Sequence, residues 1–144
     1  MSGLISKSDK AKLFAEQMHA NQFDKAGSPY ICHLSFVAKI LASENDDTIA
    51  VAWLHDSVED TETTIDDIKY LFGESIADAI DAITKRQGED YQDYLVRVKS
   101  NEIARKVKIA DLTHNMDLSR LYRITEKDLS RQRKYQQAKQ FLQT

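Results

Sequence analysis

The segment Trp53–Thr61 concentrates side chains that could bind a cation. It holds one imidazole and three carboxylates within six residues, directly after the apolar run Ile49–Leu54. These groups are His55, Asp56, Glu59 and Asp60. Carboxylates at helical spacings of three and four residues repel one another, so a helix that collects them is destabilised. A divalent cation among them would offset this repulsion, and the segment therefore predicts a metal-dependent site.

His55 and Asp56 are neighbours in the sequence, which limits how both could bind one ion. Successive residues on a regular helix point about 100° apart. Two arrangements remain: the ion lies at the rim of the helix, or the helix loosens at this point. Glu59 and Asp60 follow four residues later and return to the same two faces.

Two further residues could complete the ligand set. His33 lies on a predicted helix, and Asp111 lies in the apolar run Val107–Leu112, where burying an unpaired carboxylate would be costly. Each also has a structural interpretation, as a hydrogen-bonded core histidine or as a carboxylate paired with a lysine or arginine. Two imidazoles and two carboxylates form a mixed nitrogen and oxygen site, which favours Mn²⁺, Fe²⁺ or Zn²⁺ over Mg²⁺ or Ca²⁺.

A second polar group lies on the helix that carries Asp111. Lys108, Asp111 and Asn115 are spaced i, i+3 and i+7 and so share one face. This face offers a cation for a phosphate, a metal ligand, and an amide able to contact a sugar or a base. Alternatively, Lys108 forms a salt bridge to Asp111, and Asn115 is an ordinary polar residue at the end of the helix. His114 lies off this face and is interpreted as structural, and His19 is expected to point to solvent.

The elements that position these residues are predicted to be helical throughout. The chain has one proline and four glycines, and no segment alternates with period two for long, so no sheet is expected. Helices are predicted over residues 9–21, 30–43, 47–56, 74–84, 90–99, 102–121 and 126–142, with loops at 23–29 and 86–89. A further short helix is predicted to begin with Thr63 or Thr64 as its N-cap and to stop at Gly73. We therefore predict an all-α fold, a compact bundle of about seven to eight helices that forms a single domain over residues 1–144.

The apolar spacing within the first two helices predicts which side chains face the core. In the first helix the predicted stripe is Leu13, Phe14 and Met18. In the second helix the predicted buried residues are Ile31, Leu34, Val37, Ile40 and Leu41.

Charge divides the chain into two unequal halves. The net charge is −3, but residues 1–96 carry 8 Lys and Arg against 18 Asp and Glu, whereas residues 97–144 carry 12 against 5. An acidic half suits a metal cation and a basic half suits an anionic substrate, although both could be solvated helix faces. A nucleic-acid-binding protein is usually basic overall, so no nucleic-acid partner is expected.

Several absences in the sequence favour the cytoplasm. No apolar run approaches the roughly 20 residues needed to span a bilayer, so no membrane association is expected. The N-terminal stretch Met1–Lys7 lacks the long apolar segment of a secretory signal. A single cysteine, Cys32, excludes an internal disulfide and any zinc motif built from cysteines.

The order His33, His55–Asp56, Asp111 resembles the pattern of the HD-domain metal-dependent phosphohydrolases. Longer segments resemble the RelA/SpoT-type (p)ppGpp hydrolases, including the small stand-alone alarmone hydrolases. His19–His33 resembles their opening motif, and Trp53–Thr61 resembles their His-Asp-x-x-Glu-Asp-Thr motif. Two further blocks of that family are matched by Thr84–Lys85 and Lys108–Met116. The resemblance extends in consistent order from about residue 10 to residue 120.

This resemblance implies an all-helical hydrolase of the stringent response that binds one Mn²⁺ and removes the 3′-pyrophosphate of (p)ppGpp. The implied metal ligands are His33, His55, Asp56 and Asp111. The residues implied to orient and deprotonate the attacking water are Glu59 and Asp60. The implied contacts to a small-molecule nucleotide substrate are Lys25, Lys85 and Lys108 at the phosphates, Asn115 at the nucleoside, and Arg131 and Tyr135 around the nucleoside pocket.

Two positions depart from the family pattern. Asp24 stands where the family has an Arg beside the bound nucleoside, and Leu34 stands where it has Pro after the metal-binding His. A carboxylate repels phosphate and cannot stack on a base as a guanidinium does. An HD phosphohydrolase acting on another nucleotide or phosphate ester is therefore an alternative, as is a non-catalytic nucleotide-sensing HD module. The resemblance also allows a homodimer, although no strip of sequence is apolar enough to predict an interface.

Overall fold

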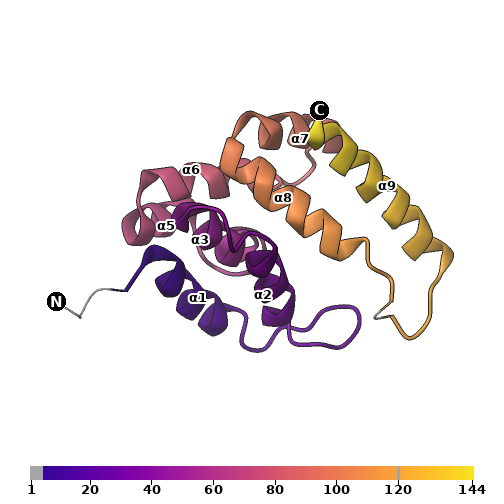
Figure 1. Ribbon diagram of the computed structural model, residues 1–144, viewed down its shortest axis with the longest axis horizontal. Coiled ribbons are helices and arrows are strands. Elements are labelled where there is room, and N and C mark those ends of the chain that lie inside the picture. Colours follow the sequence, from indigo (N-terminus) through magenta and orange to yellow (C-terminus); the bar gives the residue numbers. More distant parts are fainter. Residues whose placement is uncertain (1–4, 120) are drawn as a thin grey trace.

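The computed structural model describes residues 5–119 and 121–144, and helices dominate this part of the chain (Figure 1). The helices are α1 (Lys7–Met18), α2 (Ile31–Ile40), α3 (Asp46–Leu54), α4 (Ser57–Asp60), α5 (Ile65–Phe72), α6 (Glu74–Ile83), α7 (Tyr91–Ser100), α8 (Glu102–Asn115) and α9 (Glu126–Gln143). Helix α4 has only four residues, and the other eight are longer. Among the described residues the only β-type pairing is an isolated bridge between Phe23 and Pro29. The predicted all-α fold is confirmed.

Polar side chains fix where most of these helices begin. In six cases a side-chain oxygen before the first turn accepts a backbone N–H from within it, and each such cap contributes about 1 kcal/mol. The capping residues are Ser6, Asn45, Thr64, Asp90, Asn101 and Thr125. Between α5 and α6, Gly73 has a φ of 97°, a conformation that glycine adopts far more readily than other residues.

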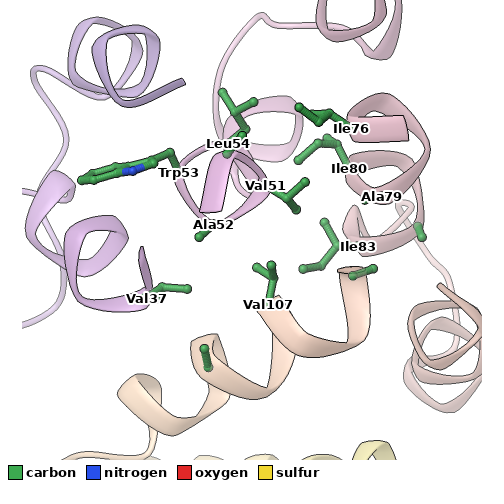
Figure 2. Close-up of a cluster of buried hydrophobic side chains, with 14 of the residues drawn as sticks. Val37, Val51, Ala52, Trp53, Leu54, Ile76, Ala79, Ile80, Ile83 and Val107 are labelled. Atoms are coloured by element: carbon green, nitrogen blue, oxygen red, sulfur yellow. The ribbon is translucent and has the colours of Figure 1, made fainter. Parts of the chain in front are cut away.

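Helix α3 lies at the centre of the molecule. It buries Thr48 and every residue from Ala50 to Leu54, and a helix that is buried around most of its surface must be surrounded by others. Its neighbours are α1, α2, α6 and α8. Figure 2 shows Val51 facing the isoleucines of α6, with Val107 of α8 completing that side of the core. The carboxyl end of α3 is therefore held rigidly, and His55 follows directly after it.

Helix α1 packs on α3 through small residues rather than through the predicted stripe. Ala11 and Ala15 are fully buried, whereas Leu13 is 59% exposed and Met18 is 37% exposed. Alanines at the contact allow two helix axes to approach closely, so the larger side chains turn outward. The prediction was therefore wrong for Leu13 and Met18. It was also wrong for Ile40, which is 44% exposed at the end of α2.

Helix α8 ends at Asn115, earlier than the predicted end at residue 121. The Asp117 backbone N–H bonds to the His114 carbonyl, and the Asp117 Oδ1 accepts the N–H of Ser119 at 2.9 Å. Such local side-chain bonds compete with helix formation. The chain then turns and returns as α9, which packs alongside α8 (Figure 1). Residue 120, within the predicted helix, lies outside the described residues.

The sequence predicted no membrane-spanning segment and no secretory signal at the N-terminus. Over the described residues, no helix combines the length and the apolar character that crossing a bilayer requires. The first four residues of the N-terminal stretch lie outside the described residues.

Candidate metal centre

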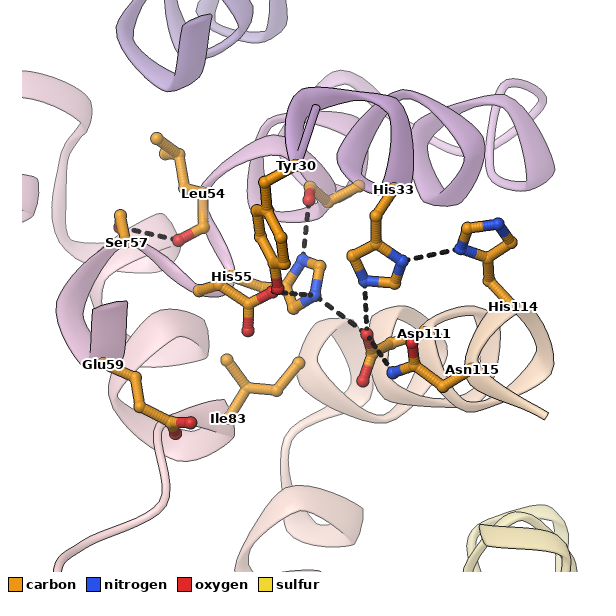
Figure 3. A network of polar contacts seen from close by, with 12 residues as sticks. Tyr30, His33, Leu54, His55, Ser57, Glu59, Ile83, Asp111, His114 and Asn115 are labelled. Atoms are coloured by element: carbon orange, nitrogen blue, oxygen red, sulfur yellow. Dashed lines mark hydrogen bonds and ion pairs between the residues drawn. The ribbon is translucent and has the colours of Figure 1, made fainter. Parts of the chain in front are cut away.

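Four side chains predicted as metal ligands lie together between α2, the end of α3 and α8 (Figure 3). One donor atom from each of His33, His55, Asp56 and Asp111 lies within 4.8 Å of the other three. His33 Nε2 is 2.8 Å and His55 Nε2 is 3.2 Å from the same oxygen, Asp111 Oδ1. Both histidines and Asp111 are buried. Imidazole nitrogens and carboxylate oxygens that converge in this way fit a divalent metal ion.

A break in the helix lets two adjacent residues reach this point. Helix α3 ends at Leu54 and α4 starts at Ser57, so His55 and Asp56 form the junction. Ser57 Oγ donates to the Leu54 carbonyl at 2.6 Å, and Asp56 has φ −102° and ψ 1°, which is outside the helical range. The loosened helix, rather than an ion at the rim of a regular one, is the arrangement that the structure adopts.

Each imidazole is held through the nitrogen that faces away from the carboxylates. His55 Nδ1 donates to the Ala52 carbonyl at 2.7 Å, which leaves Nε2 directed at Asp56 and Asp111. His33 Nδ1 lies 2.7 Å from Nδ1 of His114. Contacts of this kind fix the orientation of metal-binding histidines.

Asp111 is surrounded by groups that keep it ionised. Lys108 Nζ lies 3.1 Å from its Oδ2, and Asn115 Nδ2 donates to its Oδ1 at 3.2 Å. Burial raises the pKa of Asp111, but Lys108 and the two histidines outweigh burial and hold the pKa well below its usual value. Burial lowers the pKa of Lys108, yet Asp111 raises it well above the ordinary range. The salt-bridge interpretation of Lys108 is therefore realised in the structure.

His55 and Asp56, the two residues between α3 and α4, shift the pKa of each other in opposite directions. Burial lowers the pKa of His55, but Asp56 and Asp111 more than compensate and raise it well above its usual value. Burial raises the pKa of Asp56, and His55 opposes this strongly enough to lower it. The two carboxylates thus require an adjacent positive charge, which an imidazolium or a divalent cation can supply.

Helix α4 carries Glu59 and Asp60, the residues predicted to act on water. Both are exposed, and neither belongs to the four-residue cluster found among the described residues. The backbone N–H of Lys85 donates to Glu59 Oε1 at 3.3 Å. Loss of hydration, together with Asp56 and Glu59, raises the pKa of Asp60 to about 6. A carboxyl group with this pKa can exchange a proton near neutral pH.

A cavity of about 290 Å³ adjoins the cluster and collects four of the six predicted substrate contacts. These four lining residues are Lys25, Asn115, Arg131 and Tyr135. Burial and the nearby Arg131 lower the pKa of Lys25, while Asp128 opposes them. Lys85 and Lys108 are not among the lining residues; they contact Glu59 and Asp111 instead. The cavity thus combines cations, an amide and aromatic surface, as a nucleotide site would need.

Asp24, the departure from the family pattern, also lines this cavity and has a clear structural role. Its Oδ1 accepts the backbone N–H groups of Ala26 and Ser28, at 2.9 and 3.0 Å. Aspartate commonly closes tight turns by accepting bonds of this type. Asp24 therefore shapes the loop that carries Lys25.

Tyr30 was not predicted as a site residue, yet it connects the cavity to the cluster. It lines the cavity, and its hydroxyl donates to Asp56 Oδ2. Burial and the neighbouring Asp56 raise the pKa of Tyr30, so the hydroxyl keeps its proton. A sequence signal existed, because Tyr30 precedes His33 by three residues at the start of a helix and so faces the same side.

The prediction that His19 points to solvent was wrong. His19 is 1% exposed, and its Nδ1 lies 2.7 Å from Gln22 Oε1. Gln22 in turn donates from Nε2 to the carbonyl of Asp60 at 3.0 Å. His19 is the C-cap residue of α1, and its ring lies 5.3 Å from that of Tyr30 after the chain has turned back. The helical pattern carried no signal for that reversal.

Comparisons with known proteins match this chain to the same group of proteins that its sequence motifs resemble. A family model described as the HD domain matches residues 11–141. The chain is 36% identical over 120 residues to a probable guanosine-3′,5′-bis(diphosphate) 3′-pyrophosphohydrolase of Synechocystis sp., covering 74% of this chain and 16% of that protein. It is 34% identical over 125 residues to the bifunctional (p)ppGpp synthase/hydrolase SpoT of Escherichia coli K12, covering 78% and 18%. It thus spans less than a fifth of the length of these curated relatives.

A solved structure shares the fold over nearly the whole chain. It is described as a metazoan ortholog of SpoT that hydrolyzes ppGpp, and it aligns with a TM-score of 0.79 at 22% identity. The alignment covers 99% of this chain and 88% of that one. The predicted resemblance to RelA/SpoT-type proteins is confirmed by these matches. Since the family model covers most of the sequence, the chain belongs to the HD domain family.

Proposed function

We propose that this chain is a divalent-metal-dependent phosphohydrolase that removes the 3′-pyrophosphate of (p)ppGpp. The proposal depends on one observation: the metal-binding cluster and the neighbouring cavity are connected by hydrogen bonds from residues that line the cavity. A buried cluster of two imidazoles and two carboxylates lies beside a cavity of about 290 Å³ that contains Lys25 and Arg131. Tyr30 and Asn115 line the cavity and bond to Asp56 and Asp111 of the cluster.

The proposed metal is one Mn²⁺ ion held by the four clustered side chains. Mixed imidazole and carboxylate donors favour Mn²⁺ and its transition-metal neighbours over Mg²⁺. A divalent ion in such a site lowers the pKa of water and polarises the scissile phosphate. The contacts of His55 to Ala52 and of Asp111 to Lys108 hold the donor atoms in place before the ion binds.

Glu59 and Asp60 supply the proposed acid–base chemistry. Glu59 takes a proton from the attacking water, and the Lys85 backbone N–H steadies its carboxylate. Asp60, whose pKa is raised to about 6 mainly by loss of hydration, can hold or release a proton at working pH. Proton transfer by a positioned carboxylate typically accelerates a reaction by about 10²–10⁴-fold.

The cavity supplies substrate binding in this proposal. Lys25 and Arg131 offset phosphate charge, while Asn115 and Tyr135 contact the nucleoside. Lys108, which is paired with Asp111, and Lys85, whose backbone N–H bonds to Glu59, would neutralise charge on the phosphoryl oxygens. The names of the bacterial relatives support the guanosine polyphosphate as substrate.

The test is to incubate the purified chain with Mn²⁺ and a panel of ppGpp, pppGpp, deoxynucleoside monophosphates and nucleoside triphosphates. Anion-exchange analysis then identifies the substrate and the bond that is broken. Release of pyrophosphate from ppGpp is the expected result. No product from ppGpp, with turnover of another nucleotide, would refute the assignment of substrate.

A second candidate keeps the chemistry and changes the nucleotide or phosphate ester. Asp24 favours it, because this carboxylate lines the cavity where RelA/SpoT-type hydrolases carry an Arg. The substrate panel distinguishes the two candidates directly. A non-catalytic nucleotide sensor would bind a nucleotide with Mn²⁺ present and turn over no member of the panel.

A further inference from the structure

His114 occupies an unusual place beside the metal cluster. It lies three residues after Asp111 on α8 and is only 4% exposed. Its ring centroid lies 4.9 Å from that of His33, with the two ring planes 21° apart, and its face stacks on Phe36 at a centroid distance of 4.1 Å. Figure 3 shows His114 on the far side of His33 from Asp111, joined to His33 by a hydrogen bond.

The short contact between the two rings requires a proton between them, and the ring that supplies it depends on what His33 Nε2 binds. Without a metal ion, the ionised Asp111 carboxylate can only accept, so His33 Nε2 donates to it. The two Nδ1 atoms are 2.7 Å apart, so one must donate and the other must accept. His33 Nε2 faces Asp111 at 2.8 Å and is the nitrogen available to a metal ion. Once a metal ion takes the Nε2 lone pair, the neutral imidazole of His33 carries its single proton on Nδ1. Nδ1 of His114 is then the acceptor, and that ring is protonated on Nε2.

We propose that His114 is a positioning residue that fixes the tautomer and ring orientation of His33 for metal binding. Phe36 packs against one face of His114 and limits its rotation, so the acceptor nitrogen stays directed at His33. Replacing a residue that hydrogen-bonds to a metal-binding histidine typically weakens metal affinity by about 10–100-fold. The inference rests on the proposed metal site, but it does not depend on which substrate is hydrolysed.

The two imidazole ligands differ in a way that makes the inference testable. The partner of His55 is the backbone carbonyl of Ala52, which substitution cannot remove. The partner of His33 is a side chain. His114→Phe keeps a flat ring that can stack on Phe36 but has no acceptor, whereas His114→Gln offers a carbonyl oxygen in place of the ring nitrogen.

The first experiment measures Mn²⁺ affinity by calorimetry on chelator-treated protein that comprises residues 1–144. We expect His114→Phe to bind Mn²⁺ about 10–100-fold more weakly, and His114→Gln to recover part of that loss. The Mn²⁺-induced rise in melting temperature should shrink in the same order. Thr113→Val is the matched control on α8, because its hydroxyl bonds only within its own helix, to Ile109 at 2.8 Å. Wild-type Mn²⁺ affinity in His114→Phe would overturn the inference.

The second experiment needs no variant and therefore decides the matter even if His114→Phe fails to fold. Protein labelled with ¹⁵N-histidine is loaded with diamagnetic Zn²⁺, and the protonation of each ring nitrogen is read by NMR. We expect His33 to carry its proton on Nδ1, and His114 to carry its proton on Nε2. A proton on Nδ1 of His114 in the Zn²⁺-loaded protein would refute the inference. Neither readout measures hydrolysis, so failure of the proposed function leaves both results interpretable.

Discussion

At the scale of single residues, Asp111 has more functions than any other side chain of the site. Its Oδ1 meets both ligand histidines and receives the Asn115 amide, and its Oδ2 is paired with Lys108. A buried carboxylate is tolerated only when its neighbours satisfy it. The same neighbours that stabilise Asp111 in the fold therefore keep it ionised and oriented toward the cluster, as the proposed role of metal ligand requires.

Replacing Asp111 with Asn should separate these two functions. The variant leaves Lys108 without its carboxylate, and we expect chelator-treated protein to lose about 2 kcal/mol of stability. This figure lies below that of fully buried pairs because the Lys108 side chain keeps 16% exposure. Urea unfolding measures the loss, and metal analysis should find no bound Mn²⁺. The double variant Lys108→Met, Asp111→Asn should regain stability without regaining metal; equal stability of the two variants would contradict the argument.

Glu59→Gln should retain Mn²⁺ and lose turnover. The amide keeps the size of the side chain but cannot take a proton from water, so we expect kcat to fall by about 10²–10⁴-fold. Calorimetry with Mn²⁺ and steady-state kinetics with ppGpp measure the two effects separately. Glu62→Gln, at an exposed position just beyond α4, is the matched control and should leave kcat unchanged. An unchanged kcat in Glu59→Gln would remove this residue as the base.

At the scale of elements, the four-residue helix α4 depends on hydrogen bonds as well as on the packing of Val58 against the core. A helix this short is not stable by itself and depends on outside contacts. Thr61 Oγ1 donates to the Ser57 carbonyl at 2.6 Å, and Gln22 donates to the Asp60 carbonyl at 3.0 Å. Gln22 is held in turn by the buried ring of His19. The loop after α1 thus helps to place the two carboxylates of α4.

Gln22→Met should therefore weaken catalysis without weakening metal binding. The variant keeps the side-chain length and removes the donor to Asp60, so we expect kcat to fall by roughly 10-fold as α4 shifts. Mn²⁺ affinity should stay at the wild-type value, because the bond from Gln22 goes to Asp60, which is not one of the four clustered residues. Gln17→Met, exposed on α1, is the control. A parallel loss of Mn²⁺ affinity would show that Gln22 acts on the metal cluster instead.

A second element-scale prediction concerns the loop between α6 and α7. Arg97 of α7 pairs with Glu89 and also donates to the Thr84 carbonyl at 2.9 Å. The hydrogen bond from Arg97 lowers the pKa of Glu89 to about 2 from a usual value of 4.5. A carboxyl group whose pKa is lower in the folded than in the unfolded state stabilises the fold at pH values above the unfolded-state pKa. This stabilisation disappears as the pH falls toward the folded-state pKa of about 2.

Glu89→Gln should thus be less stable than wild type at pH 7, and the difference should shrink as the pH falls below about 4.5 and approaches 2. Urea unfolding at a series of pH values measures this convergence. Glu74→Gln is the control, since its ion pair with Lys69 at 3.8 Å is widely exposed. A difference that stays constant with pH would exclude the Glu89 carboxylate as its source.

Much of this element-scale arrangement was predictable from the sequence, and the failures have physical causes. Capping residues such as Thr64 and Asn101 are local signals, so the helix starts that they set could be read directly. The end of α8 could not, because it depends on the Asp117 turn. The core face of α1 was misread because close helix packing selected the small Ala11 and Ala15 over larger apolar neighbours.

The site shows the same division between local and tertiary information. The grouping of His33, His55, Asp56 and Asp111 was predicted from the motifs, and the structure brings these four together. The contact between His114 and His33 was not predicted, because residues 81 positions apart in the chain meet only after α2 and α8 have packed. Tyr30 lies between these two cases. Its spacing of three residues before His33 is a local signal, but its bond to Asp56 was not predicted from it.

At the scale of the whole molecule, the cluster joins three separate parts of the chain. His33 comes from α2, His55 and Asp56 from the α3–α4 junction, and Asp111 from α8. A ligand that binds only this assembled arrangement stabilises the folded state as a whole. The proposed metal would therefore contribute to global stability as well as to chemistry.

Removing the metal should lower the melting temperature of the entire domain. With free Mn²⁺ at 100 times its dissociation constant, the expected stabilisation is about 2.7 kcal/mol. Scanning calorimetry with Mn²⁺ and with a chelator measures the shift. His55→Ala, which lacks one donor, should melt at the same temperature under both conditions. A chelator-independent melting temperature for wild type would mean that the ion does not bind the folded chain tightly.

The separation of the ligands along the chain also sets the order of events during synthesis. Asp111 follows His33 by 78 positions and His55 by 56, with α5, α6 and α7 between them. A growing polypeptide exposes three of the four donors well before the last is translated. Closing so long a segment has an entropic cost, which is offset when α8 packs on α2, α3 and α6. Uptake of the proposed ion would therefore follow the synthesis and packing of α8, and bound metal would mark the molecules in which α8 has joined the other elements of the cluster.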